Sequence, residues 1–141
     1  MDFEYHYSKE QEDFRQEVKN WLSDNIPEEM KAPVDLKDLN ETQYWFWREK
    51  HKELAQKGWL FPTYPTSYGG GGLSGEHETI LEEEFHQARV VKSFNSSLIF
   101  GTLLVWGTEE QKQKFLTPFL KSESVSFQNF SEPQAGSDLA S

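Results

Sequence analysis

The residues best suited to chemistry lie near the end of the printed sequence, in the run SEPQAGSD at residues 131–138. This run combines two hydroxyls, two carboxylates, a proline and a glycine: Ser131, Ser137, Glu132, Asp138, Pro133 and Gly136. Such a loop can offer backbone N–H groups and hydroxyls to a ring-shaped or phosphate-bearing ligand, because glycine lets the backbone approach closely. An ordinary strand-to-turn connection has the same composition. The loop residues alone leave both interpretations open.

The residues before this loop predict a β-strand. Apolar and polar side chains alternate over SVSFQNF, residues 124–130, with one break near the end. That pattern is typical of a half-buried strand that leads into a tight polar loop. A single strand leaves its backbone N–H and C=O groups without partners. We therefore expect the sequence to stop in the middle of a fold.

A second candidate site is the run of four glycines, Gly69 to Gly72. A phosphate-binding P-loop needs Lys and Ser or Thr directly after its glycines, and a dinucleotide-binding loop needs G-x-G-x-x-G after a strand. The residues that follow, Leu73, Ser74 and Gly75, fit neither pattern. We interpret the run as a flexible turn that lets the next helix pack closely.

A third candidate is the pair Glu83 and His86, whose spacing suits a metal site in a helical bundle. A two-metal site needs a second such pair, and no other histidine has an acid three residues before it. The run Glu82 to Glu84 could suggest paired carboxylates, but a charge run on a helix is usually a solvated face. Only Glu84 falls on the apolar stripe. The sequence therefore predicts no metal site and no catalytic residue.

Helical patterns fill the sequence before these last residues. A capping box at Ser8–Gln11 begins a helix that ends before Pro27, and a second helix runs from about Asn40 to Lys57. Ser74 opens a third helix after a loop at residues 59–72. Residues 94–106 are apolar almost all round and predict a buried helix.

A last helix begins at a second capping box, Thr108–Gln111, and Pro118 predicts a kink or an end. Its expected buried set is Phe115, Leu116, Phe119 and Leu120. The sequence thus predicts an all-α, up-down bundle of about five helices over residues 1–123. Residues 124–141 would supply the first strand and the binding loop of an incomplete β-domain.

Composition excludes several classes of function. The net charge of −10 argues against a nucleic-acid partner, which needs a basic face. No apolar run approaches the length of about 20 residues that spans a membrane. Cysteine is absent, which rules out thiolate chemistry and fits a reducing compartment, and the acidic amino-terminal residues have no leader pattern. We therefore expect a soluble, cytoplasmic protein.

Three segments together resemble the amino-terminal third of the acyl-CoA dehydrogenases. They are YGGGGLSGEHETILEEE at residues 68–84, GTEEQKQKFLTPFLKSE at residues 107–123, and SEPQAGSD. In that family a YGG-x-G-L segment opens a helix, and a TEPGAGSD loop follows a helix that begins GTEEQK. The resemblance covers most of residues 8–141. It implies a helical domain followed by the opening strand of a middle β-domain.

The resemblance also implies a flavin site. In the family the strand end and the loop bind FAD, which maps onto Gln128, Asn129, Phe130, Ser131, Glu132, Pro133, Gln134, Ala135, Gly136 and Ser137. Ser131 and the backbone of Phe130 would contact the flavin ring. Gly136 and Ser137 would lie near the pyrophosphate, and Ser137 also near the thioester substrate.

Three residues depart from the family pattern. Gln134 stands where glycine is usual, Ser131 replaces the commoner threonine, and Asn129 precedes Phe130 where small apolar residues are frequent. Serine in place of threonine keeps the hydroxyl donor. Gln134 is expected to change the shape of the loop at its phosphate contacts, and FAD binding itself is expected to be retained.

The function implied by the resemblance is α,β-desaturation of an acyl-CoA thioester. A carboxylate takes the α-proton, and the β-hydrogen leaves as hydride to FAD. Electrons then pass to an electron-transferring flavoprotein, and the enzyme is a homo-oligomer, a dimer or tetramer. The family's catalytic glutamate lies beyond residue 141, so this piece alone is expected to be inactive. Two alternatives are a non-catalytic partner subunit and a helical interaction module.

Overall fold

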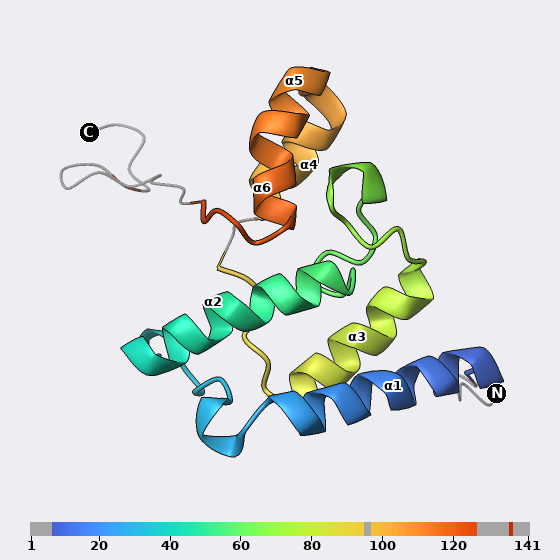
Figure 1. Ribbon diagram of the computed structural model, residues 1–141, viewed down its shortest axis with the longest axis vertical. Helices are drawn as coiled ribbons and strands as arrows, with labels where there is room; N and C mark the ends of the chain where they lie inside the picture. Colours follow the sequence, from blue (N-terminus) through green and yellow to red (C-terminus); the bar gives the residue numbers. More distant parts are fainter. Residues whose placement is uncertain (1–6, 95–96, 127–135, 137–141) are drawn as a thin grey trace.

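The described structure, a computed structural model, covers residues 7–94, residues 97–126 and Gly136. Three helices come first: α1 (Lys9–Asn25), α2 (Glu41–Gln56) and α3 (Gly75–Gln87). Then α4 (Ser97–Trp106) forms a hairpin with a continuous helical stretch, made of α5 (Glu109–Gln111), η4 (Lys112–Leu116) and α6 (Thr117–Leu120). Short 3₁₀ turns join them: η1 (Glu28–Met30), η2 (Leu36–Asp38) and η3 (Thr66–Tyr68). In Figure 1 the hairpin stands above the first three helices.

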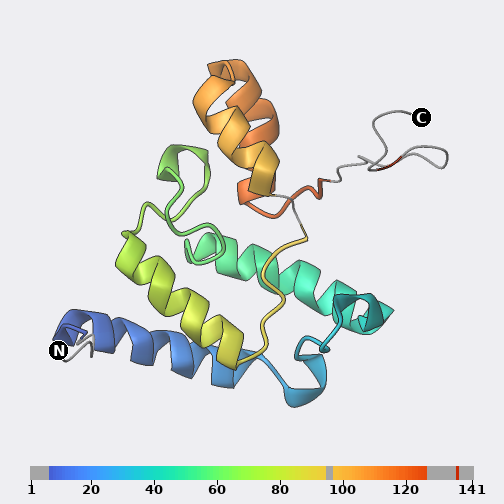
Figure 2. The same cartoon turned by 180° about the vertical axis from the view of Figure 1, so that it is seen from behind.

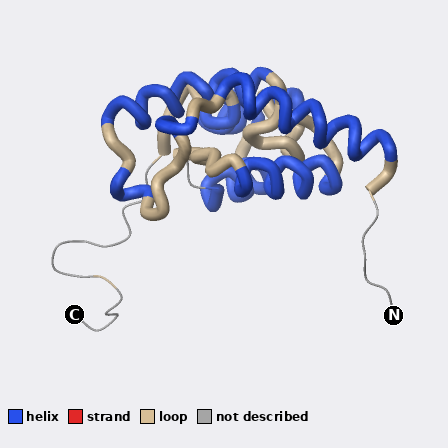
Figure 3. The backbone as a smooth tube through the Cα atoms, turned by 90° about the horizontal axis from the view of Figure 1, so that it is seen from below, coloured by secondary structure: helices blue, strands red, loops and turns tan. Residues whose placement is uncertain are grey.

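Within the described residues the fold is all-α, as the sequence predicts, and Figure 3 draws only helices and loops there. Ser124 lies in a bend, and residues 125–126 belong to no regular element. The rest of the expected strand, from Phe127 onward, lies outside the described residues. The strand and the domain boundary at residue 124 therefore stay predictions.

The helix starts follow from local capping chemistry. Ser8 and Gln11 form the predicted reciprocal capping box, and so do Thr108 and Gln111. Each box satisfies backbone N–H groups that have no partner inside the helix. A third box, Asn40 with Gln43, begins α2 and was not anticipated from the sequence.

Two apolar clusters hold the helices in place. The larger joins α1, α2 and α3 through Val18, Trp47, Leu54, Leu81 and Phe85, each at most 4% exposed. The smaller lies inside the hairpin around Phe100, Leu116 and Leu120, which are fully buried. Seen from behind, the segment after α3 crosses α2 on its way to α4 (Figure 2). His51 of α2 contacts that segment, with Nε2 2.5 Å from the Val91 carbonyl oxygen.

The prediction of a helix buried all round at residues 94–106 is wrong. Helix α4 begins only at Ser97, and Leu98, Val105 and Trp106 are 66%, 68% and 83% exposed. Phe100 is fully buried because that side of α4 packs on η4 and the loop before η3. The opposite side has no cover among the described residues, so its apolar side chains face outward.

The predicted buried set of the last helix is also partly wrong. Leu116 and Leu120 are fully buried and Phe119 packs beside them, but Phe115 is 44% exposed. The reason is the π-helical turn η4, where the N–H of Thr117 bonds to the carbonyl of Lys112, five residues earlier. A π-turn holds an extra residue, which moves Phe115 off the apolar stripe. Pro118 therefore follows a widened turn, and the helix continues to Leu120.

Candidate functional site

Most residues of the predicted flavin site lie outside the described part of the chain. These are Gln128 to Gln134, Ala135 and Ser137. Gly136 is described, and it lies exposed in a bend. A glycine without cover lets a ligand approach its backbone closely, which fits a phosphate-bearing cofactor. The described part of the chain before the site ends at residue 126, after α6.

The chain leaves α6 through a tight C-terminal cap. Ser122 adopts a left-handed conformation with φ of +56°, and its N–H donates to the carbonyl of Phe119 at 3.0 Å. The N–H of Glu123 donates to the carbonyl of Pro118 at 2.9 Å. These two bonds are the Schellman pattern, which satisfies carbonyls at a helix end. The direction in which residues 123–126 depart is therefore set at Ser122.

The side chain of Ser122 joins this cap to α2. Ser122 is 2% exposed, and its Oγ accepts a hydrogen bond of 3.4 Å from Nη1 of Arg48. The side chain of Lys121, the residue before Ser122, packs against Gly69. A Cβ added to Gly69 would lie 2.8 Å from Lys121 Cγ. Neither contact was anticipated. Arg48 and Ser122 are far apart in the sequence and fit no motif.

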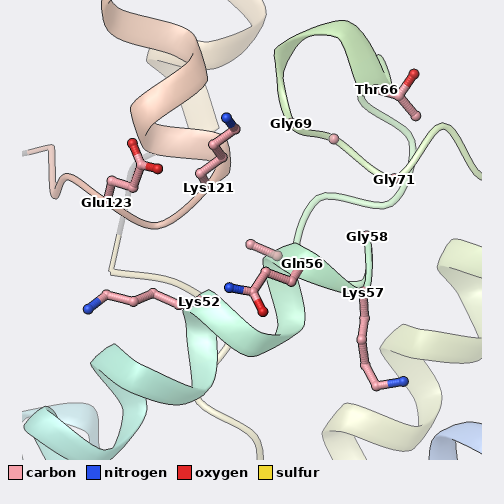
Figure 4. Close-up of a pocket in the computed structure, with 11 residues that line it drawn as sticks. Lys52, Gln56, Lys57, Gly58, Thr66, Gly69, Gly71, Lys121 and Glu123 are labelled. Atoms are coloured by element: carbon pink, nitrogen blue, oxygen red, sulfur yellow. The ribbon is translucent and has the colours of Figure 1, made fainter.

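A cleft of about 600 Å³ lies beside the C-terminal end of α6 (Figure 4). It is bounded by the end of α2, the glycine loop and the end of α6, and its charged lining residues are Lys52, Lys57, Lys121 and Glu123. The lysine ammonium groups lie at different edges and do not converge on one point. Lys52 and Lys57 are also paired, with Glu49 at 2.8 Å and Glu17 at 3.6 Å.

The glycine loop itself does not offer its N–H groups to this cleft. The N–H groups of Gly69, Gly70, Gly71 and Gly72 donate to carbonyls of the same loop, at 2.9–3.1 Å. A phosphate cradle needs such groups free and pointing at the ligand. The glycines serve packing instead: a Cβ on Gly71 would collide with the carbonyl oxygen of Gly58. This agrees with the sequence interpretation of a close-packing turn.

The carboxylates of α3 are structural. Glu84 is 3% exposed and binds Nη1 of Arg15 at 2.5 Å, while Glu83 binds Nη2 of the same guanidinium at 2.6 Å. The hydrogen bond from Arg15 lowers the pKa of Glu83. His86 is exposed. In the part of the chain that the structure describes, no three His, Cys, Asp or Glu residues gather as a metal site would require.

Among the described residues, His51 is a further buried titratable group, and it is 1% exposed. Burial lowers its pKa to about 4, an effect reinforced by the nearby charge of Arg48 and opposed by the bond to Val91. The ring is therefore neutral at pH 7. It donates from Nε2, since a carbonyl oxygen can only accept. His51 thus fastens the segment after α3 to α2 and does not supply a catalytic base.

Comparison with known proteins connects this helical unit to one family. Residues 8–123 match the family described as "Acyl-CoA dehydrogenase, N-terminal domain". The chain belongs to the acyl-CoA dehydrogenase family. It is 34% identical to acyl-CoA dehydrogenase IpdE1 of Mycolicibacterium smegmatis, over 93% of this chain and 35% of that protein. Mitochondrial isovaleryl-CoA dehydrogenase of Pongo abelii is 33% identical, over 95% of this chain and 31% of that protein.

A solved structure shows the same arrangement of elements. The ChsE4-ChsE5 complex from Mycobacterium tuberculosis holds a chain that superimposes with a TM-score of 0.72 and is 28% identical. The match covers 98% of this chain and 34% of that one. The chain therefore spans about a third of the length of the acyl-CoA dehydrogenase relatives it matches. No helix in the described ranges has the length and apolar character needed to cross a membrane.

Proposed function

We propose that the full-length protein is an FAD-dependent acyl-CoA dehydrogenase that introduces an α,β double bond into an acyl-CoA thioester. The observation that carries this proposal is the family match over residues 8–123, with the loop SEPQAGSD further along the chain at residues 131–138. Relatives of similar sequence are named acyl-CoA and isovaleryl-CoA dehydrogenases. The 141-residue piece is expected to be inactive by itself, because the family resemblance implies that the catalytic glutamate lies beyond residue 141.

The residues proposed to hold the cofactor are those of the strand end and the loop, residues 128–137. When bound, FAD supplies the hydride acceptor. The hydroxyl of Ser131 and the backbone of Phe130 would hold the flavin ring, and the backbone of Gly136 would hold phosphate oxygens. Ser137 would bind both phosphate and the thioester end of the substrate. The exposed position of Gly136 supports this assignment, since its backbone is accessible to a ligand.

Helix α4 is proposed to wall the pocket for the acyl chain. Its outward side carries Leu98, Val105 and Trp106, which are mostly exposed in the described structure. Large apolar patches on a protein surface usually mark a binding or packing face. An acyl chain, together with further protein that covers the helix, would remove this surface from water.

The finer parts of the proposal concern partners and location. We propose acyl-CoA as substrate, an electron-transferring flavoprotein as electron acceptor, and a homotetramer or dimer as the assembly. Family membership supports these proposals. A cytoplasmic location is proposed because the sequence lacks cysteine, which fits a reducing compartment.

A loop variant tests the cofactor assignment. Ser131→Ala in the full-length protein should weaken FAD binding by about fivefold to tenfold, because one hydrogen bond to the ring is lost. Ser137→Ala should raise the KM for acyl-CoA as well. The matched control is Ser74→Ala, at the start of α3 and outside residues 128–137 of the sequence. If the Ser131 and Ser137 variants bind FAD and acyl-CoA like the unaltered protein, the assignment is wrong.

A second candidate function is a non-catalytic partner subunit. The observation that favours it is the similarity to a chain in a complex of two differently named proteins, ChsE4 and ChsE5. Such a subunit would complete a site on its neighbour. Expression of the full-length protein alone and together with a candidate dehydrogenase-like partner separates the two cases. A partner subunit would show flavin reduction by acyl-CoA only when co-expressed.

A further inference from the structure

A second cleft, of about 410 Å³, lies between α3 and the loop that precedes the glycine run. One wall is a single face of α3, whose lining residues are spaced by three or four positions: Glu78, Leu81, Glu82 and Phe85. Ligand pockets usually measure about 300–1,000 Å³. The cleft is at the lower end of this range, so it suits one side chain or small group and not a whole cofactor.

The wall opposite α3 is aromatic and firmly held. Phe61 and Tyr64 line it and meet edge to face, with ring centroids 5.9 Å apart. Phe61 also packs on Phe100, at 5.1 Å between centroids, so both rings belong to the smaller apolar cluster. Aromatic rings attract cations through the negative charge of their faces. This wall therefore favours a flat or cationic group.

Glu78 lines the cleft as a half-buried carboxylate that has no cation beside it. Among the described residues it makes no ion pair, and the hydrogen bond that it accepts from Oγ1 of Thr63 is long, at 3.3 Å. An O–H···O bond usually measures about 2.5–3.0 Å. The charge of Glu78 adds to burial in raising the pKa of Tyr64, which places negative potential at the aromatic wall. A half-buried charge of this kind is stabilised when a cation binds to it.

The rim of the cleft already holds a cation. Lys92 pairs there with Glu82, and the two side chains are 54% and 52% exposed. An exposed pair contributes little stability, so a second cation can rearrange it at small cost. The net charge of −10 also favours a basic partner, because opposite charges steer two proteins together.

We infer that this cleft is a docking site for an arginine side chain of a basic protein partner. Arginine suits the cleft better than lysine, because its planar guanidinium stacks on aromatic rings and binds a carboxylate through two hydrogen bonds. Glu78 receives the guanidinium, and the aliphatic stem lies along Phe61 and Tyr64. The inference goes beyond the proposed function and does not depend on FAD or acyl-CoA binding.

The test measures how a fluorescent peptide, GSGLRLGSG, binds to the full-length protein by fluorescence anisotropy. The same peptide with glutamine in place of arginine should bind about tenfold more weakly or worse, because it lacks the charge. Glu78→Gln should weaken binding of the arginine peptide by about tenfold as well. Its Tm should be no lower than that of the unaltered protein, since the change removes a half-buried charge that has no ion pair.

The matched control is Glu76→Gln, an exposed acid of α3 that does not line this cleft. It should bind the arginine peptide within about twofold of the unaltered protein. Equal affinity for the two peptides, or an unchanged affinity in Glu78→Gln, would overturn the inference. If arginine methyl ester alone binds as tightly as the arginine peptide, the cleft is a small-molecule site and the docking inference is wrong. The flavin spectrum of the same preparation tests the proposed function separately.

Discussion

The side chain of His51 shows how a polar residue can be necessary for packing alone. It lies between Trp47 and Phe94, with ring centroids at 5.9 and 5.1 Å, and it donates to the carbonyl of Val91. Burial favours the neutral ring, so protonation of the imidazole costs folding free energy. Its pKa falls from 6.5 to about 4 on folding.

This shift makes a prediction about acid stability. A histidine whose pKa is lowered in the folded state contributes full stability above its unfolded pKa of 6.5 and loses it as the pH falls toward 4. Between pH 7 and pH 5 the free energy of unfolding should drop by about 2 kcal/mol from this group. Urea unfolding at both pH values, compared with His51→Gln, measures it. Parallel losses in the two proteins would contradict the account, because glutamine donates the same bond without titrating.

Two glycines with opposite surroundings give a second prediction. A Cβ on Gly71 would meet the carbonyl oxygen of Gly58 and lie 2.8 Å from that of Pro62, whereas a Cβ on Gly75 would meet nothing within 4 Å. Gly71→Ala should therefore destabilise the chain by about 2–4 kcal/mol. Gly75→Ala, at the first turn of α3, should be neutral or stabilise by up to about 1 kcal/mol. Thermal melting of the two variants measures the contrast, and equal Tm changes would refute it.

Among the elements, the junction of α1 and α3 depends on one guanidinium. Arg15 is 11% exposed and holds two carboxylates, of which Glu84 is buried and Glu83 is 43% exposed. Lys19 approaches Glu84 only to 3.8 Å. Removing Arg15 would leave a buried carboxylate without its main partner.

We therefore expect Arg15→Gln to cost about 3 kcal/mol of unfolding free energy. The matched control is Glu83→Gln, which removes the exposed ion pair between Arg15 and Glu83. This change should cost less than about 1 kcal/mol of unfolding free energy. Denaturant titration of both variants gives the two values. If both variants lose the same small amount of unfolding free energy, the buried ion pair with Glu84 contributes no more than the exposed ion pair with Glu83, and the account is wrong.

The helices could be predicted from the sequence where residues close together in the sequence determine them. Capping boxes located the starts of α1 and α5, because their hydrogen bonds involve residues three positions apart, and apolar spacing located α2 and α3. The exposed side of α4 was not predictable, since an apolar run is the same whether or not something covers it. The π-turn that moves Phe115 outward also has no signal in the sequence.

The candidate site was predictable only as a segment. The loop at residues 131–138 was found from its composition and its family resemblance, and its contacts remain predictions. The bond between Arg48 and Ser122 could not be found this way. It joins residues 74 positions apart, and neither residue belongs to a motif.

The chain as a unit carries an uncovered apolar surface on α4, formed by Leu98, Val105 and Trp106. It also matches only about a third of the length of its relatives. The 141-residue piece alone should therefore associate with itself as its concentration rises, because association removes this surface from water.

Sedimentation of the piece measures that association. The double variant Val105→Ser with Trp106→Ser should shift the association to at least tenfold higher concentration, since each side chain buries large apolar area. Trp45→Ser is the control, because Trp45 is 58% exposed on α2, outside this surface. If the control shifts the association concentration equally, or the double variant does not shift it, the surface on α4 is not the contact between copies.

The central claim, that the full-length protein is a flavin-dependent acyl-CoA dehydrogenase, is tested most directly by its visible absorption spectrum. The spectrum is recorded without oxygen, before and after the addition of acyl-CoA thioesters of increasing chain length. We predict oxidised flavin bands that bleach with one class of thioester. A protein that is colourless, and stays so after incubation with FAD and removal of the excess, would contradict the claim.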